Sequence, residues 1–503
     1  MKTTAIRLFS LLTGIILFDY LFYKQEPGVN VLLFVLLILL LIKVSGRQLF
    51  QNRRQVLATL GWLVSGISVA LYGSILSVLA FSGAALVFLG YSLEPELKAP
   101  PLSMIRSGLN FFAAPFTFGR EIADSFMPKH HLLRLMRTLK LLIIPVILVI
   151  TFIMIYRSAN PLFDKTFDFI DIQFNRFIEW IEHYLSVAHL MFIIFSTVLF
   201  MGILYRSLNT LLVKLEANKP DELVRQKRSR QRYLITKARM TALKDEFRMG
   251  LFIFAMLNSV LLLANVTEIL WLNSEYKKIS APIMSKNLHE GTWLLIVSIM
   301  LSMLVTLILF RKNLNFYSRN KWLVIGALTW IIQNLVLGIN VALRNGYYIS
   351  EYGLTYKRIG VFFCLLLVII GLMFLWIKIR QKKSTWYLLR MNCWSIYIAF
   401  LLFSIINWDS IIITYNLRDN APRIDPYNII RLPDRNLRLL FLNHEKLNAA
   451  DPASEPTIGS KLTEKAINFQ ERIRDKEWKS FNYMEWRAAK FLDASTQVEK
   501  QNQ

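Results

Sequence analysis

Long uncharged apolar stretches constrain this chain more than any other feature. Residues 31–41, for example, read VLLFVLLILLL without a single polar side chain. A helix needs roughly 20 apolar residues to cross the hydrocarbon core of a bilayer. Eleven stretches approach that length, at 8–23, 28–43, 56–73, 76–93, 139–157, 186–205, 249–272, 292–310, 322–343, 359–378 and 391–408. The sequence therefore predicts an all-α polytopic helical membrane protein with about 11 transmembrane helices.

Composition supports this class and excludes others. Hydrophobic residues make up 54% of the 503 positions, against roughly 45–50% in soluble domains. A disordered chain and an ordinary globular enzyme are therefore excluded. Both cysteines, Cys364 and Cys393, lie inside apolar stretches, which excludes a disulfide framework.

Two of the apolar stretches need separate interpretation. The stretch 56–93 is too long for one helix, and we expect it to break at Gly73 and Ser74 into a tight hairpin of two spans. The stretch 31–41 carries no polar residue, so we expect it to face lipid. The first span resembles a signal peptide, but it lacks a small-residue cleavage site and contains Asp19, so we expect it to be retained.

Lysine and arginine counts predict the orientation. With the N-terminus in the cytoplasm, the segments between spans hold 34 of these residues on the inner side and 10 on the outer side. Cytoplasmic loops carry such an excess in most multi-span proteins. The chain is therefore expected in a bacterial plasma or inner membrane, with the N-terminus cytoplasmic and the C-terminus outside. The net charge of +25 then reflects cytoplasmic loops rather than nucleic-acid binding.

We expect three regions along the chain. Residues 1–138 form an N-terminal membrane region of about four helices plus a cytoplasmic loop, and 139–408 form the main membrane bundle of about seven helices. Residues 409–503 form a small helical domain outside the membrane, with helix starts at the pairs Asp425-Pro426 and Asp451-Pro452.

Two loops suggest contact with the lipid surface. The inner loop 206–248 contains a basic cluster at 225–232, which is typical of a cytoplasmic loop and compatible with anionic lipid headgroups. The outer loop 158–185 spaces apolar residues at helical intervals between acidic ones, and we expect an amphipathic helix there. The predicted partners are the bilayer, anionic headgroups and an unknown protein, but not nucleic acid.

Sequence motifs for catalysis are missing. The chain contains no H-E-x-x-H, C-x-x-C, G-x-S-x-G or Walker motif, so we assign no catalytic residue, no metal ligand and no cofactor. One weaker alternative is an outer metal site formed by Glu179, Glu182, His183 and His189.

Polar residues inside the apolar stretches are the candidate site, because a buried charge costs roughly 2.5–3.5 kcal/mol at a helix centre. In one stretch Asn258, Asn265 and Glu268 share a helix face, and in another Gln333, Asn340 and Arg344 do. An outward-facing pocket with Glu268 paired to Arg344 is one interpretation, and helix–helix adhesion through hydrogen bonds is the other. The candidate ligand-pocket residues are Asp19, Asn265, Glu268, Gln333, Asn340, Arg344, Glu351, Tyr352, Thr355 and Arg358.

One outer loop carries a family resemblance. Leu343-Arg344, Tyr348, Tyr352-Gly353-Leu354-Thr355 and Arg358 resemble the signature of an uncharacterised bacterial multi-pass membrane family, a domain of unknown function of the four-one-seven-three or four-one-five-three type. Ala159-Asn160-Pro161-Leu162-Phe163 and Tyr415-Asn416-Leu417-Arg418 resemble it too. The resemblance implies a multi-pass topology and no activity. From the residues alone, Gly353 permits a tight turn with positive φ.

Three function classes remain open. The preferred one is a multi-pass membrane protein of unknown molecular activity that senses or scaffolds at the cell envelope, or acts there as an accessory protein. The alternatives are a transporter with an outward-facing polar pocket and a membrane enzyme acting on a lipid-linked substrate.

Overall fold

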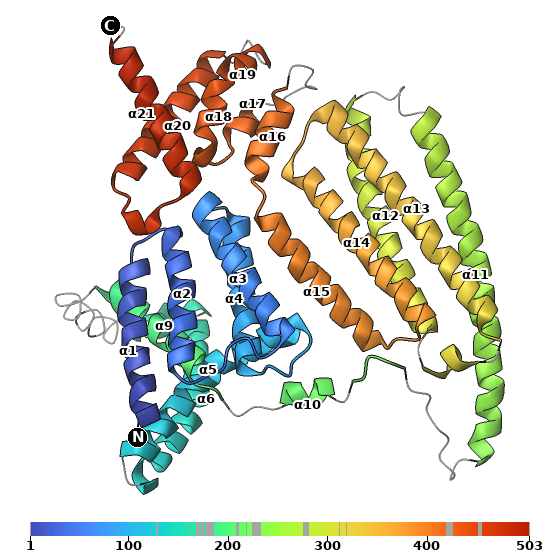
Figure 1. The fold of residues 1–503 in the computed structure, drawn as a ribbon, viewed down its shortest axis with the longest axis horizontal. Coiled ribbons are helices and arrows are strands. Elements are labelled where there is room, and N and C mark those ends of the chain that lie inside the picture. The colour runs from blue at the N-terminus through green and yellow to red at the C-terminus, as the bar shows by residue number, and fades with distance from the viewer. Residues whose placement is uncertain are drawn as a thin grey trace. The chain divides into compact units, whose positions relative to one another are not determined.

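The structure, a computed structural model, is helical throughout the part that it describes. It describes residues 2–126, 129–159, 161–166, 173, 176, 186–207, 211–217, 219–223, 233–274, 281–310, 312–317, 319–418, 426–450 and 455–501. These residues contain no strand, only one isolated β-bridge between Glu222 and Lys383. The predicted all-α polytopic fold is confirmed. The chain divides into two compact units, one of residues 1–213 and 476–483 and the other of residues 214–475 and 484–503 (Figure 1).

The first unit is a bundle of apolar helices. Its helices are α1 (Lys2–Phe22), α2 (Val29–Val44), α3 (Arg53–Tyr72), α4 (Ile75–Leu93), α5 (Pro100–Phe126), α6 (Lys129–Ala159), α7 (Pro161–Thr166) and α9 (Val187–Leu204). Aromatic rings fill its centre: the Trp62 ring stacks on Phe88, with 4.9 Å between centroids, and packs edge-on against Phe34. Apolar contact of this kind is the main source of stability inside the bundle.

The predicted break at Gly73 and Ser74 is confirmed. Gly73 ends α3 in the left-handed region, with φ of 56°, and Ser74 caps α4 by accepting a hydrogen bond from the Ser77 amide at 3.0 Å. Glycine adopts this φ without steric cost, and serine is a preferred N-cap. The long stretch 56–93 therefore forms two helices packed against each other.

A close approach of two backbones holds α4 against α5. A Cβ atom built at Gly90 would lie 2.0 Å from the carbonyl oxygen of Ser103. No side chain fits in that space, so glycine is required at this crossing.

A short C-terminal segment also belongs to the first unit. Residues 476–483, which include the helical turn η4 (Trp478–Ser480), contact the loops at the ends of α1, α2 and α3. The Val29 amide donates to the Phe481 carbonyl oxygen at 3.0 Å, and Lys476 pairs with Glu26 at 2.7 Å.

The second unit contains a second group of apolar helices. They are α11 (Tyr233–Ser274), α12 (Ala281–Leu309), α13 (Lys321–Tyr352), α14 (Tyr356–Arg380) and α15 (Thr385–Ser404), with η1 (Lys312–Phe316) before α13. The short α10 (Leu211–Ala217) lies at the boundary of the two units. Their shared core includes Phe254, Ile299, Leu323 and Leu372.

The rest of the second unit is a C-terminal helical domain of residues 408–475 and 484–501, and its helices are shorter and more polar. They are α16 (Trp408–Asn416), α17 (Pro426–Ile430), η2 (Asp434–Asn436), α18 (Leu437–Leu442), α19 (His444–Ala450), α20 (Glu455–Arg474) and α21 (Tyr483–Gln501). Two small cores hold them, one around Ile413, Leu447 and Ile458 and one around Leu437 and Phe469.

The described part of the chain contains eight helices that are long and apolar enough to cross a membrane. They lie at Thr4–Phe22, Arg53–Tyr72, Ile75–Leu93, Val187–Leu204, Lys244–Leu270, Lys321–Tyr352, Tyr356–Arg380 and Thr385–Ser404. Three shorter apolar helices lie at Val29–Val44, Leu148–Ala159 and Leu294–Leu309. Each of these helices coincides with one of the predicted stretches, so the chain has the helices of a multi-span membrane protein.

Candidate functional site

The two charges of the predicted pocket are paired. Glu268 lies on α11 and Arg344 on α13, and these two helices share a long interface. An Nη1 atom of Arg344 lies 3.3 Å from Oε1 of Glu268, and the two side chains are only 10% and 15% exposed. At such low exposure, removing one partner costs more than the pair itself contributes, because the other charge stays buried.

Amide side chains join the same two helices. Asn265 donates to the backbone carbonyl of Gln333 at 3.1 Å, and Asn258 donates to the carbonyl of Gly326 at 3.1 Å. Five buried amide atoms on these helices have no hydrogen-bond partner among the described residues: Oδ1 of Asn258, Asn265 and Asn334, Oε1 of Gln333 and Nδ2 of Asn340. Some amide groups at this interface therefore join the two helices by hydrogen bonds, whereas others keep a donor or acceptor that no described residue uses.

The loop after α13 is held by an arginine and an asparagine. Gly353 has a φ of 77°, as its position in a tight turn predicts. The Arg358 guanidinium donates to the carbonyls of Tyr352, at 2.7 Å, and Gly353, and lies 4.2 Å from the Tyr348 ring centroid. The Asn416 side chain accepts a hydrogen bond from the Leu354 amide at 2.6 Å and donates one to the Leu354 carbonyl at 2.9 Å.

The remaining predicted residues do not join this cluster. Glu351 is exposed near the end of α13, and Thr355 precedes α14 without a side-chain cap bond. Asp19 belongs to the first unit, where its Oδ1 lies 2.7 Å from Nε2 of His189.

Several predictions fall outside the described residues. These are most of the outer amphipathic helix 158–185, the whole basic cluster at 225–232, and Glu179, Glu182 and His183 of the metal alternative. Within the described ranges, no group of three or more His, Cys, Asp or Glu side chains is placed to hold a metal ion.

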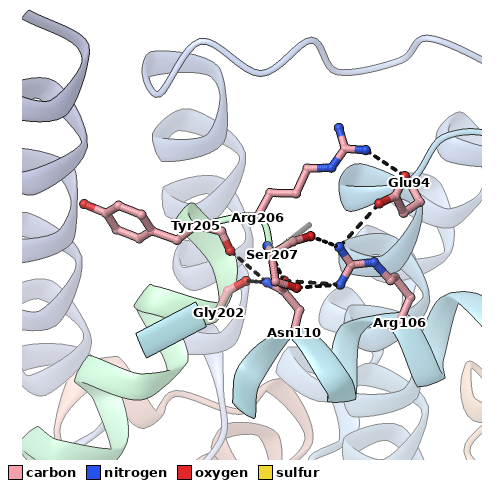
Figure 2. A network of polar contacts seen from close by, with 7 residues as sticks. All are labelled: Glu94, Arg106, Asn110, Gly202, Tyr205, Arg206 and Ser207. Carbon is pink, nitrogen blue, oxygen red and sulfur yellow. Dashed lines mark hydrogen bonds and ion pairs between the residues drawn. The ribbon is translucent and has the colours of Figure 1, made fainter. Parts of the chain in front are cut away.

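A buried ionic network in the first unit was not predicted from the sequence. Glu94, which follows α4, is 4% exposed, and Arg106 on α5 is fully buried. Nη2 of Arg106 lies 3.3 Å from Oε1 of Glu94, while Arg206 reaches Oε2 of the same carboxylate at 2.8 Å (Figure 2). One buried carboxylate thus pairs with two guanidiniums, and the three groups together keep one positive charge.

Asn110 extends this network to the end of α9. Its amide donates to the carbonyls of Gly202 at 2.7 Å and Tyr205 at 2.9 Å, and its oxygen accepts from the backbone and hydroxyl of Ser207 (Figure 2). Arg106 also donates to the Ser207 carbonyl at 2.7 Å. The last carbonyls of a helix lack intrahelical partners; this network satisfies that of Gly202 near the end of α9.

Beside the network lies a polar cavity of about 660 Å³. Its lining combines arginines and glutamates, namely Arg7, Arg47, Arg206, Glu94, Glu96 and Glu121. Arg7 pairs with Glu121 at 3.0 Å, and Arg47 donates to the carbonyls of Ile203 and Leu204 at 2.8 Å.

Three arginines and three glutamates line this cavity, and burial together with nearby charges shifts the pKa of two of its lining groups. Burial, together with the positive charges of Arg7, Arg206 and Arg106, lowers the pKa of Arg47 to about 10, so Arg47 remains charged at neutral pH. Burial and the nearby Glu121 carboxylate raise the pKa of Tyr205 to about 12. The Tyr205 hydroxyl is buried and has no hydrogen-bond partner among the described residues.

Sequence reasoning missed this network because its members come from separate segments. We expected a cytoplasmic loop after the four helices of residues 1–138 and assigned no site residue to it. A usable signal was the spacing of Ser103, Arg106, Ser107 and Asn110, which places polar groups on one helix face.

Comparison with known proteins gives one match. A family model described as "Domain of unknown function (DUF4153)" matches residues 8–440, which is most of the chain and includes every predicted pocket residue. No curated protein and no solved structure matches the chain. The predicted resemblance is confirmed, and of its two types the match is to four-one-five-three: the chain belongs to the DUF4153 family.

Proposed function

We propose that this chain is a multi-span protein of a bacterial plasma or inner membrane that senses or scaffolds at the cell envelope. The N-terminus lies in the cytoplasm, and the C-terminal helical domain lies outside and is the working part. Anionic lipid headgroups contact the basic inner loops, and an unidentified protein receives the output.

One observation carries this proposal. The polar side chains on α11, α13 and α14 bond mainly to one another and to backbone: Glu268 to Arg344, Asn265 to the Gln333 carbonyl, and Arg358 to the Tyr352 carbonyl. Groups used in this way hold helices together and are not free to act on a substrate.

The arrangement of loops in the first unit supports the orientation. The segments 45–52, 94–99 and 205–207 line one cavity, whereas 24–28, 73 and 476–483 contact one another. Lysine and arginine counts assign the first group to the inside.

Single cysteines test this orientation in a chain whose Cys364 and Cys393 are replaced by serine. Trp478→Cys should react with an impermeant maleimide in intact cells, and Glu96→Cys only after permeabilisation; the reverse pattern would overturn the orientation.

Complementation of a deletion strain tests whether the C-terminal helical domain is the functional part. Leu447 is fully buried in one core of the C-terminal domain, so Leu447→Asp should unfold that domain and abolish resistance to envelope stress. Ile467→Asp is the control, because Ile467 is about half exposed on α20. If Leu447→Asp complements fully although proteolysis shows the domain unfolded, the proposal is wrong.

A transporter is the second candidate, favoured by the buried amide atoms of Asn265, Gln333 and Asn340 that lack partners. A transporter of this kind would also use the nearby charges of Glu268 and Arg344. Loss of complementation by Glu268→Gln, at unchanged protein level and thermal stability, would favour transport over sensing.

A further inference from the structure

Three arginines gather around a small cavity in the C-terminal helical domain. The cavity has a volume of about 280 Å³ and lies between α16, α18 and α21. Arg435 is in η2, Arg438 is in α18, and Arg487 is in the first turns of α21. Neutral hydrogen-bonding groups come from Ser410, Thr414 and Asn436. Among the described residues that line it, none is acidic.

The acidic residues closest to these arginines in the chain are already engaged, Asp409 by Arg435 itself and the others by Arg472. Asp409 is 1% exposed and accepts hydrogen bonds from Nε and Nη2 of Arg435, at 3.0 and 2.5 Å. Arg472 lies 3.3 Å from both Asp434 and Glu485. The acidic neighbours are therefore used in holding the domain together.

Arg438 and Arg487 are left without a counter-charge. Neither makes a hydrogen bond or ion pair with another described residue of the chain, although Arg438 is half-buried. Two like charges at one cavity repel each other unless an anion lies between them. The cavity thus has a net positive charge and unused donors.

The walls of this cavity are built on a packed core. Leu437 and Ala488, the neighbours of Arg438 and Arg487 in the chain, are both buried in the core that contains Phe469. The Ser410 hydroxyl donates to Oδ1 of Asn436 at 3.1 Å, which joins α16 to η2. The backbone that carries Arg438 and Arg487 is therefore fixed before any ligand arrives, which lowers the entropic cost of binding.

We propose that this cavity binds the phosphate group of a small ligand on the outer side of the membrane. Guanidinium groups match phosphate oxygens in paired, charge-assisted hydrogen bonds. The first two turns of α21 contribute Met484 and Arg487 to the lining, and a helix N-terminus favours an anion. Leu439, Leu442 and Ala488 form an apolar wall, which suits an apolar part attached to the phosphate. The inference rests on the proposed function, because it supplies the ligand that a sensing domain would detect.

The phosphate has two possible sources, a lipid headgroup or a soluble phosphate ester. Binding is measured on the full chain in nanodiscs of phosphatidylcholine, by titration with inorganic phosphate and with glycerol phosphate, and with acetate as the competing anion. A second preparation contains phosphatidylglycerol, and retained lipid is identified by native mass spectrometry. Saturable phosphate binding favours the soluble source, and selective retention of phosphatidylglycerol favours the lipid.

The test variant is Arg438→Gln with Arg487→Gln. Its matched control is Arg431→Gln with Arg474→Gln, which removes the same charge from exposed positions of the same domain outside the cavity. We expect the test variant to raise the dissociation constant, or reduce lipid retention, at least tenfold, and the control to change either by less than twofold. Equal binding by both variants, or binding of acetate as tight as that of phosphate, would overturn the proposal.

Failure of this inference can be told apart from failure of the proposed function. The binding measurement needs no biological activity, whereas complementation by Leu447→Asp needs no ligand. If the cavity variant binds normally while Leu447→Asp still abolishes complementation, the domain works through another surface and only the phosphate site is lost.

Discussion

Asn482 donates a hydrogen bond from its side-chain amide to the backbone carbonyl of Val69 at 3.0 Å, although the two residues are 413 positions apart. The same carbonyl accepts the Gly73 amide at 2.8 Å, which closes α3. A residue near the end of the sequence thus completes a helix end formed near its beginning.

Asn482→Asp should lower the thermal midpoint of the purified protein more than Asn482→Ala does. Alanine loses one hydrogen bond, worth about 0.5–1.5 kcal/mol, whereas aspartate also places an acceptor against the Val69 carbonyl. Thermal unfolding in detergent measures both. Equal midpoints for the two variants would mean that packing, and not the hydrogen bond, is what Asn482 contributes.

Glu94→Gln should destabilise the protein by about 3–5 kcal/mol, the usual cost of leaving a buried charge without its partner. Two guanidiniums, of Arg106 and Arg206, lose their shared carboxylate. The control is Glu96→Gln, because Glu96 is exposed two residues away. A chemical-denaturation series on both variants distinguishes them, and a Glu94→Gln curve that overlays the control would refute this role.

Tyr205→Phe should stabilise the protein, because a buried hydroxyl without a partner costs about 1–3 kcal/mol and phenylalanine keeps the ring. The gain should grow at high pH. The pKa of Tyr205 is raised from 10.0 to about 12 in the folded state. Between pH 10 and about 12 the tyrosine therefore ionises more readily in the unfolded state, and the wild type loses stability that it has in full below pH 10. Unfolding midpoints of variant and wild type at pH 8, 10 and 11.5 check the trend. A variant less stable than wild type at pH 8 would show that the hydroxyl has a partner.

Gly90→Ala should disrupt the crossing of α4 and α5, because the new methyl group would lie 2.0 Å from the Ser103 carbonyl oxygen. Overpacking typically costs about 1–3 kcal/mol, and backbone atoms yield less than side chains. Gly83→Ala on the same helix is the matched control, since a Cβ there meets nothing within 4 Å. Size-exclusion profiles after heating should separate the two, and equal survival would contradict the close approach.

Local chemistry explains which features the sequence predicts. The turns at Gly73 and Gly353 follow from residue types beside each other in the chain. The pairing of Glu268 with Arg344 follows from helical spacing and from the cost of an unpaired charge in an apolar helix.

Other features depend on packing that no local pattern encodes. We expected residues 31–41 to face lipid, but Val35 and Ile38 are buried, while Leu36 and Leu40 are about 57% and 58% exposed. A uniformly apolar helix has no periodicity that distinguishes its two faces. The network around Arg106 joins three separate segments, and the positions of its partners become visible only once the helices are packed.

The placement of residues 476–483 has a consequence for the order of biosynthesis. A ribosome releases the N-terminal hairpins long before it reaches Asn482. The hydrogen bond between Asn482 and the Val69 carbonyl, at the end of α3, can therefore form only after some four hundred further residues have been translated. The earliest helices can form while the chain grows, but the loops that residues 476–483 contact are completed only after translation has reached Asn482. Messages that stop early would therefore leave an N-terminal bundle with an unfinished surface, which quality-control proteases can recognise.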